Sequence, residues 1–187
     1  MISESRHTNR AVFVDRDGTL CPDVNYCRCP DDFTLFSEVP LAIKMLNKAG
    51  FKVIVITNQS GIARGYFTEE MLTKIHQKMR DELKINEAYL DAIYYCPHHP
   101  NDKCRCRKPG TLLFEKAAKD MDIDLVQSFV IGDRDIDIKA GEAIGSKTLL
   151  VATGPQKGST SASTPDYAAK NLLDAAQWIK KVVHEKY

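Results

Sequence analysis

Two acidic clusters are the residues in this sequence most suited to chemistry. The stretch VFVDRDGTL contains Asp15 and Asp17, and the stretch GDRDID at 132–137 contains Asp133 and Asp137. A close pair of carboxylates is costly unless a cation is bound beside it. Mg²⁺ suits such a pair, because it usually takes one or two carboxylates and completes its shell with water and phosphate oxygens. One D-x-D-G sequence alone fits a solvated turn equally well, but two clusters favour a shared magnesium site.

A group of thiols and imidazoles lies in the stretch CPHHPNDKCRC, here called the cysteine–histidine loop (residues 96–106). Cys96, His98, Cys104 and Cys106 offer three thiolates and one imidazole, which is a complete tetrahedral ligand set for Zn²⁺. A closed shell of four ligands leaves no position for water, so a structural zinc is favoured. The alternative is a loop of free thiols.

Two cations, Arg107 and Lys108, follow this loop directly. A metal there would fix both side chains before an anion binds, which is the preorganisation that anion-stabilising sites need. His99 is a spare imidazole, which either replaces His98 as a ligand or faces solvent or substrate.

Three further cysteines, Cys21, Cys27 and Cys29, lie near the first acidic cluster. A rival zinc site there has no fourth ligand close by in the sequence, so free loop thiols are the plainer interpretation.

The elements that must position these residues alternate between strands and helices. Apolar runs rich in β-branched residues predict strands at 11–14, 52–56, 92–95, 129–131 and 148–151. Amphipathic stretches with capping residues or glycine stops predict helices at 38–49, 68–85, 111–121 and 136–144, and a last helix from Asn171. The segment 154–165, rich in Gly, Ser, Thr and Pro, is expected to be a mobile loop.

This alternation predicts an α/β fold, with a Rossmann-like parallel sheet covered by helices on both faces. The 187 residues suit a single domain over 1–187, and no stretch is long enough for a large cap domain. Ligands of such folds bind at the carboxyl ends of the strands. Asp15, Thr57, Cys96 and Asp133 each follow a predicted strand, so we expect one site at that edge.

The order of these motifs resembles that of the haloacid dehalogenase superfamily. DRDGT, the ITN turn, the RKP lysine and GDRxxD match its four motifs across about residues 11–152. The resemblance implies a phosphatase in which Asp15 attacks phosphorus and forms an aspartyl-phosphate. It implies that Asp17 acts as general acid and then as general base. Thr57 and Lys108 would hold the phosphoryl oxygens.

The resemblance also implies the magnesium ligands. Mg²⁺ would be bound by Asp15, by the backbone carbonyl of Asp17 and by Asp133, whereas Asp137 would support that site or Lys108. One Mg²⁺ and one lysine supply the charge neutralisation that phosphoryl transfer needs.

Within the superfamily, two groups share a C-x-H…C-x-C-R-K-P loop: histidinol-phosphate phosphatases and D-glycero-D-manno-heptose 1,7-bisphosphate 7-phosphatases. TNQSGIARGYFTEE at 57–70, YYCPHHP at 94–100 and GDRDIDIKAGEAIG at 132–145 resemble the second group more. This resemblance implies removal of the 7-phosphate of the heptose bisphosphate to give heptose 1-phosphate, in making activated heptose for lipopolysaccharide or other surface glycans. Histidinol-phosphate hydrolysis in histidine biosynthesis is the alternative.

A substrate with two phosphates needs a second anion site. Arg107 is the first candidate, because its guanidinium can bind phosphate with two parallel hydrogen bonds, and Arg64 is another. The resemblance implies a substrate pocket lined by Asp23, Asn25, Tyr26, Asn58, Gln59, Ser60, Arg107 and Arg134. The segment 25–33 departs from the heptose group, because it carries Cys27 and Cys29.

Composition excludes several function classes. The formal net charge of +1 provides no overall field to hold nucleic acid. No apolar run reaches the roughly 20 residues that span a bilayer. The first ten residues contain no apolar segment of the kind found in signal peptides. We therefore expect a cytoplasmic monomer that acts on a small sugar phosphate and binds neither nucleic acid nor membrane.

Two alternatives stay open at this point. A non-catalytic module stabilised by zinc would bind a sugar phosphate or a protein without hydrolysis. A nucleic-acid 3′-phosphatase is known within the superfamily, but the sequence lacks the basic, aromatic stripe that single strands require.

Overall fold

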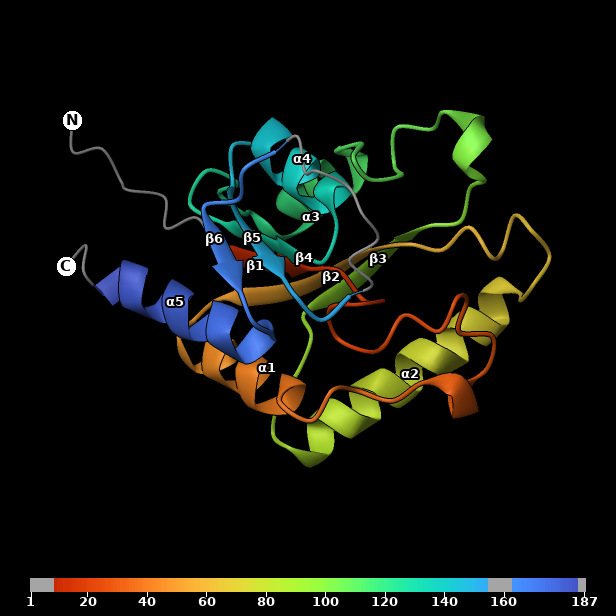
Figure 1. Ribbon diagram of the computed structural model, residues 1–187, viewed down its shortest axis with the longest axis horizontal. Helices are drawn as coiled ribbons and strands as arrows, with labels where there is room; N and C mark the ends of the chain where they lie inside the picture. The colour runs from red at the N-terminus through yellow and green to blue at the C-terminus, as the bar shows by residue number, and fades with distance from the viewer. Residues whose placement is uncertain (1–8, 155–162, 185–187) are drawn as a thin grey trace.

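A parallel β-sheet forms the centre of the protein. The computed structural model describes residues 9–154 and 163–184. Within these ranges the six strands are all parallel and lie in the order β3-β2-β1-β4-β5-β6 (Figure 1). The strands are β1 (Ala11–Val14), β2 (Lys52–Asn58), β3 (Ala92–Cys96), β4 (Phe129–Gly132), β5 (Lys147–Val151) and β6 (Tyr167–Ala169). The predicted α/β fold with a parallel sheet is confirmed.

Helices cover both faces of this sheet. The α-helices are α1 (Val39–Lys48), α2 (Glu69–Ile85), α3 (Leu112–Met121), α4 (Asp135–Ala143) and α5 (Leu172–His184). Two short 3₁₀-helices are η1 (Pro30–Asp32) and η2 (Pro100–Asp102). Helices α1, α2 and α5 lie on one face, and α3 and α4 lie on the other (Figure 1). No separate cap domain stands over the sheet in the described residues.

Strand β1 takes a central place because it is apolar on both faces. All four of its side chains are buried, as expected for a strand covered by helices on both sides. Val14 pairs with Val55 of β2 on one side and with Ile131 of β4 on the other. This register brings the carboxyl ends of β1, β2 and β4 to the same edge of the sheet.

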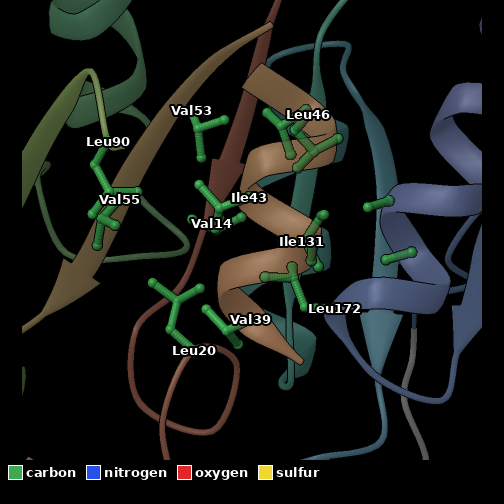
Figure 2. Packing of buried hydrophobic residues seen from close by; sticks show 14 of the residues in the cluster. Val14, Leu20, Val39, Ile43, Leu46, Val53, Val55, Leu90, Ile131 and Leu172 are labelled. Atoms are coloured by element: carbon green, nitrogen blue, oxygen red, sulfur yellow. The ribbon is translucent and has the colours of Figure 1, made fainter. Parts of the chain in front are cut away.

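The larger apolar cluster fills the space between the sheet and helices α1, α2 and α5. In Figure 2, Ile43 and Leu46 of α1 lie over Val14 and Val53 of the sheet, and each of the four is at most 1% exposed. Burial of one such side chain contributes about 1.5–3 kcal/mol. This layer therefore holds the strand that ends at Asp15 firmly in place.

The strand order reverses between β1 and β4. Strands β2 and β3 follow on one side of β1, and β4, β5 and β6 follow on the other. A crevice forms outside the carboxyl ends of the strands at such a point, and ligands of open α/β sheets bind there. Asp15 directly follows β1 and Asp133 directly follows β4, so both lie at this crevice.

Most predicted elements are present, with boundaries shifted by one or two residues. Strand β2 runs on to Asn58, so Thr57 belongs to the strand. Thr111 precedes α3 as predicted, but its hydroxyl contacts Glu115 at 2.6 Å and makes no capping bond to the backbone.

Strand β6 and both 3₁₀-helices were not predicted. Strand β6 is short and is defined by its pairing with β5, and its Tyr167 stacks on Trp178 of α5 at a centroid distance of 5.0 Å. Most of the predicted loop 154–165 lies outside the described residues. Residues 1–8, part of the N-terminal segment in which no signal peptide is expected, also lie outside them.

Candidate active site

A cavity of about 170 Å³ opens at the carboxyl edge of the sheet. Apart from Arg64, every catalytic and substrate-binding residue predicted from the sequence lines it, together with Arg16 and Ile136, which were not predicted. These residues lie at the end of β2, follow β1, β2 or β4, or follow the cysteine–histidine loop directly. The fold therefore gathers at one place residues that are far apart in the chain.

Lys108 links the two acidic clusters. Its Nζ lies 2.7 Å from Oδ1 of Asp15 and 2.7 Å from Oδ1 of Asp137, and it donates to the carbonyl of Ile56 at 2.6 Å. Burial disfavours the charge of this amine, yet Asp137 and Asp15 raise the pKa of Lys108 above its usual range. Lys108 is therefore a fixed cation beside the Asp15 carboxylate.

Burial and mutual repulsion make it unfavourable for the carboxylates near Lys108 to be ionised at the same time. Burial, together with the neighbouring Asp137 and Asp133 carboxylates, raises the pKa of Asp15 from 3.8 to about 7 against the opposing effect of Lys108. Burial also raises the pKa of Asp133 to about 6. A bound cation would favour the ionised forms of both groups.

The surroundings of the Asp133 carboxylate are suited to a bound cation. Its side chain is fully buried, and neither carboxylate oxygen has a hydrogen-bond partner. Only Nε of Arg134 approaches, at 3.6 Å. Carboxylate oxygens of Asp15, Asp133 and Asp137 lie within 4.8 Å of one another. Because a buried, unpaired carboxylate is costly, this oxygen donor set fits a hard divalent ion such as Mg²⁺. Asp137 is already paired with Lys108.

Two glycines make room for the Asp133 carboxylate. A Cβ atom at Gly18 would lie 2.4 Å from Oδ2 of Asp133, and one at Gly154 would lie 1.9 Å from it. Gly18 also has a φ of +85°, a conformation that glycine adopts at little cost. Position 18 therefore favours glycine for two reasons: the Asp133 carboxylate leaves no room for a side chain, and the backbone has a positive φ.

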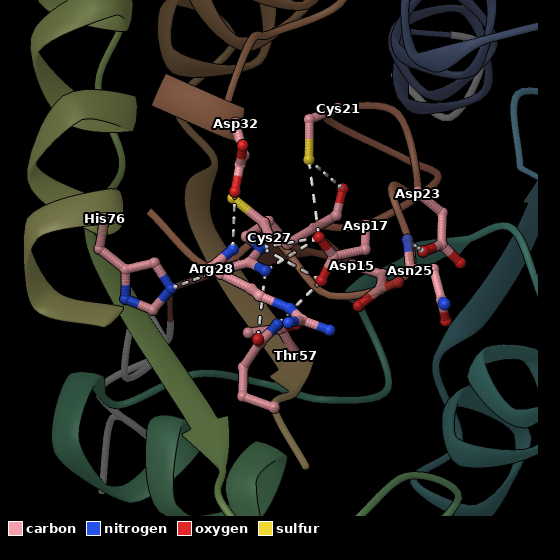
Figure 3. A network of polar contacts seen from close by, with 12 residues as sticks. Asp15, Asp17, Cys21, Asp23, Asn25, Cys27, Arg28, Asp32, Thr57 and His76 are labelled. Carbon is pink, nitrogen blue, oxygen red and sulfur yellow. Dashed lines mark hydrogen bonds and ion pairs between the residues drawn. The ribbon is translucent and has the colours of Figure 1, made fainter. Parts of the chain in front are cut away.

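Asp17 lies in a second polar network beside the cavity (Figure 3). Nε of Arg16 lies 3.1 and 3.2 Å from the two carboxylate oxygens, and Nη2 lies 2.9 Å from Oδ1. Gln59 donates from Nε2 to Oδ2 of Asp17 at 2.8 Å and to the hydroxyl of Thr57 at 2.8 Å. Asp17 is thus held from two sides and remains 24% exposed.

The end of β2 positions both a hydroxyl and the backbone of Lys108. Thr57 is buried, and Ser60 lines the cavity. The Asn58 amide accepts from the Lys108 backbone N–H at 3.0 Å and donates to the Lys108 carbonyl at 3.2 Å. Asn58 lines the cavity, and its amide also holds the Lys108 backbone; its predicted contact with substrate stays a prediction.

The loop after β1 forms the outer wall of the cavity. Asp23 forms an ion pair with Arg134 and accepts from the backbone N–H of Asn25 at 3.0 Å. The Tyr26 ring packs edge-on against Tyr66 at a centroid distance of 4.9 Å. The ion pair connects the loops that follow β1 and β4.

The two candidate arginines for a second anion differ in position. Arg107 lines the cavity, and its Nη1 is buried without a hydrogen-bond partner. Arg64 is exposed, does not line the cavity, and lies over the Tyr26 ring at 6.0 Å. An unpaired, buried guanidinium nitrogen is costly, so Arg107 is the better placed to receive an anion.

The cysteine–histidine loop brings its four predicted ligands together. Sγ of Cys106 lies 3.1 Å from Sγ of Cys96, 3.5 Å from Sγ of Cys104 and 3.1 Å from Nδ1 of His98. Zn–S bonds of about 2.3 Å in a tetrahedron place sulfurs roughly 3.8 Å apart, whereas a disulfide requires about 2.05 Å. All four residues form one group that can hold a metal ion, and the six cysteines are free thiols.

His99 has another task. Nδ1 of the His99 ring accepts from the backbone N–H of Asn101 at 3.2 Å, and the backbone N–H of His99 donates to Oδ2 of Asp102 at 2.8 Å. His99 therefore caps η2. Cys21, Cys27 and Cys29 form no comparable ligand group in the described part of the chain. Cys21 and Cys27 are buried in the larger apolar cluster.

A larger hollow of about 730 Å³ is lined by residues of α1 and α5. The described residues that line it are apolar or basic and include no acid, thiol or imidazole. The chemistry therefore assigns the candidate active site to the smaller cavity. Among the described residues, no helix has both the length and the apolar character needed to cross a bilayer.

Comparisons with known proteins decide the family. Residues 105–175 match the family model described as HAD-hydrolase-like. Over 180 residues the chain is 40% identical to the D-glycero-beta-D-manno-heptose-1,7-bisphosphate 7-phosphatase of Haemophilus ducreyi, and the match covers 91% of this chain and 98% of that one. The chain belongs to the haloacid dehalogenase-like phosphatases. It is thus an enzyme of the phosphoric monoester hydrolase class.

Other members of these haloacid dehalogenase-like phosphatases show the same relationship. A probable D-glycero-D-manno-heptose-1,7-bisphosphate 7-phosphatase of Thermoplasma volcanium is 44% identical over 67% of this chain and 86% of its own. The crystal structure of the D,D-heptose 1,7-bisphosphate phosphatase from B. bronchiseptica has a TM-score of 0.85 and 32% identity, over 92% of this chain and 99% of that one. That structure is a complex with magnesium and phosphate.

Sequence reasoning missed two buried polar residues of the site, Arg16 and His76. Nη1 of Arg16 lies 3.4 Å from Nε2 of His76, which reaches in from α2 (Figure 3). The position of Arg16 between two aspartates was a usable signal, because a cation there must face at least one of them. His76 gave no signal, since nothing local places it near the acidic clusters.

Proposed function

We propose that this protein is a Mg²⁺-dependent phosphatase that removes the 7-phosphate of D-glycero-D-manno-heptose 1,7-bisphosphate, giving heptose 1-phosphate. The observation that carries the proposal is the contact between Lys108 and Asp15 in a cavity that also contains Arg107. Relatives of near-equal length that are named for this activity support the choice of substrate. The product would enter the biosynthesis of nucleotide-activated heptose for surface glycans such as lipopolysaccharide.

The first step transfers the phosphoryl group to the protein. A carboxylate oxygen of Asp15 attacks phosphorus while the bond from phosphorus to the leaving sugar oxygen breaks. The electron pair stays on that oxygen, which takes a proton from the Asp17 carboxyl. Lys108 and Thr57 hold the phosphoryl oxygens during this transfer, which depends mainly on positioning and charge.

The second step returns the enzyme to its starting state. Asp17, now a carboxylate, takes a proton from a water molecule whose oxygen attacks phosphorus. The bond between phosphorus and Asp15 breaks, and the Asp15 carboxylate is restored. The sum of the two steps is one sugar phosphate and one water converted to a free sugar hydroxyl and inorganic phosphate.

Two metal sites belong to this proposal. Asp15, the backbone carbonyl of Asp17 and Asp133 would hold Mg²⁺, which supplies neutralisation of phosphoryl charge when bound. The neighbour crystallised with magnesium and phosphate supports this cofactor. A structural Zn²⁺ would be held by Cys96, His98, Cys104 and Cys106.

Arg107 is our candidate for the 1-phosphate. Its buried, unpaired Nη1 lines the same cavity as the Asp15–Lys108 pair. Asp23, Asn25, Tyr26, Gln59, Ser60 and Arg134 would contact the sugar from the remaining walls. We further propose that one domain, residues 1–187, carries the activity as a monomer in the cytoplasm, where free thiols persist.

Phosphate release from a substrate panel tests the proposal. The panel contains both anomers of the heptose bisphosphate, heptose 7-phosphate and histidinol phosphate, each with Mg²⁺. We expect the bisphosphate to give the highest kcat/KM and ³¹P NMR to show that the 1-phosphate remains. A preference for histidinol phosphate would replace our substrate with that of histidine biosynthesis.

Substitution of the nucleophile separates enzyme from binding module. Asp15→Asn should abolish phosphate release, because an amide cannot form the aspartyl-phosphate. Asp31→Asn, at an exposed carboxylate of η1, is the matched control and should keep full activity. Undiminished turnover by the Asp15 variant would refute the covalent mechanism.

A further inference from the structure

Arg16 is a buried cation next to the proposed acid. Its side chain is 1% exposed and is among the largest fully buried side chains of the described chain. A buried guanidinium is costly unless its donors are satisfied. Its donors reach Asp17, Gln59 at 3.1 Å and His76 at 3.4 Å, so the cation is paired on three sides.

The Asp17 carboxylate is fixed through this cation. Arg16 contacts both carboxylate oxygens, and Gln59 donates to Oδ2. Gln59 is itself held by Arg16 and by the Thr57 hydroxyl, so the amide cannot turn without losing two bonds. The Asp17 side chain is 24% exposed, and Asp17 lines the cavity. The carboxylate is therefore restrained on its inner side and open on the side where a leaving group would lie.

His76 contacts Arg16 on the side away from Asp17. It lies on α2, is 8% exposed, and packs edge-on against Tyr95 of β3. Burial, together with the neighbouring Arg16 and Arg80 charges, lowers the pKa of His76 to about 3. The imidazole is neutral, so its Nε2 accepts from Arg16. A protonated ring would instead face the guanidinium with like charge.

We propose that Arg16 is a positioning residue that aims the Asp17 carboxyl at the leaving-group oxygen, and that His76 holds Arg16 in the required orientation. The physical reason is geometric: a misplacement of about 1 Å at a reacting group can cost on the order of 100-fold in rate. This inference deepens the proposed function, because it rests on Asp17 being the acid that protonates the leaving sugar.

The leaving group distinguishes positioning from a purely structural role. A sugar alkoxide is a poor leaving group and needs a proton from Asp17, whereas p-nitrophenolate leaves without one. Loss of acid positioning should therefore reduce kcat/KM for a sugar phosphate and spare p-nitrophenyl phosphate. General fold damage lowers both values by the same factor. The ratio kcat/KM is used because it reports the step in which the leaving group departs.

The experiment compares four variants with both substrates. Arg16→Met fills the same space without donors, and Asp17→Asn is the reference for loss of the acid. His76→Leu removes the acceptor, while His76→Gln keeps one. For Arg16→Met we expect a loss of about 30–100-fold with the sugar phosphate and less than about threefold with p-nitrophenyl phosphate. His76→Leu should show a smaller loss with the same selectivity, and His76→Gln should restore most of it.

The outcomes separate this inference from the function on which it rests. Suppose that Asp17→Asn lowers kcat/KM for the sugar phosphate but not for p-nitrophenyl phosphate. The positioning role of Arg16 is then overturned if Arg16→Met lowers kcat/KM equally for both substrates, or lowers neither. If Asp17→Asn itself shows no leaving-group selectivity, then the proposed acid is wrong and the inference falls with it. If His76→Gln behaves like His76→Leu, the role assigned to His76 is overturned.

Discussion

Nζ of Lys108 lies 2.7 Å from Oδ1 of Asp15, although 93 residues separate the two in the chain. The same amine lies 2.7 Å from Asp137, so one buried cation holds both acidic clusters. The position of Lys108 is fixed in turn by the Asn58 amide, which bonds its backbone N–H and carbonyl. The charge that we propose to bind the phosphoryl group is thus set by the fold before substrate arrives.

Lys108→Met should lower kcat/KM by about 100- to 1000-fold, the usual cost of removing one charge-stabilising donor from an active site. The loss follows because Asp15 would lose its counter-charge and the phosphoryl oxygens their ligand. Lys119→Met, at an exposed position of α3, is the control and should keep its activity. Steady-state phosphate release measures both. Near-normal turnover without Lys108 would contradict its role.

Magnesium affinity should weaken as the pH falls from 8 to 5.5. Burial raises the pKa of Asp15 to about 7 and that of Asp133 to about 6, so protons bind these carboxylates of the metal-free enzyme progressively as the pH falls through this range. Protons and Mg²⁺ then compete for the same oxygens. Calorimetric titration with Mg²⁺ at several pH values checks this. A dissociation constant that is the same at pH 6 and pH 8 would count against it.

Loss of the zinc site should reduce stability more than chemistry. Cys104→Ala should bind no zinc and should melt lower by on the order of 10 °C, because binding energy of a structural zinc is folding energy. The folded fraction should keep its turnover number within about tenfold. Cys29→Ala, outside the ligand group, is the matched control. Metal analysis and thermal melting in Mg²⁺-containing buffer measure the effect. A zinc-free protein with unchanged melting would refute this prediction.

Arg107→Gln should lower kcat/KM for the bisphosphate and leave that for the monophosphate nearly unchanged. Charged hydrogen bonds contribute about 1.5–3 kcal/mol, so kcat/KM for heptose 1,7-bisphosphate should fall roughly 10- to 100-fold. Heptose 7-phosphate has no second phosphate and should be hydrolysed at a nearly unchanged rate. Arg105→Gln, whose side chain is 77% exposed, provides the control. If both substrates lose equally, Arg107 serves the reacting phosphate instead.

The sequence by itself determined the fold class and predicted most of the residues that line the candidate site. Strand β1 and helix α1 are recognisable because an apolar pattern and the glycine stop at Gly50 are local properties of the chain. Asp15, Thr57, Lys108 and Asp133 were found because each carries a chemically specific type at the end of a predicted strand or loop. Parallel pairing then requires them to meet at one edge, which is the arrangement observed.

Tertiary structure decided what each polar group does. Asn58 holds the Lys108 backbone, and Arg16 pairs with His76 of a helix that begins more than 50 residues later. Burial of Asp133 without a hydrogen-bond partner also arises only when the loops after β1 and β5 close over it. Hydrogen-bond partners and desolvation depend on contacts between distant segments, and no local pattern of residues records those contacts.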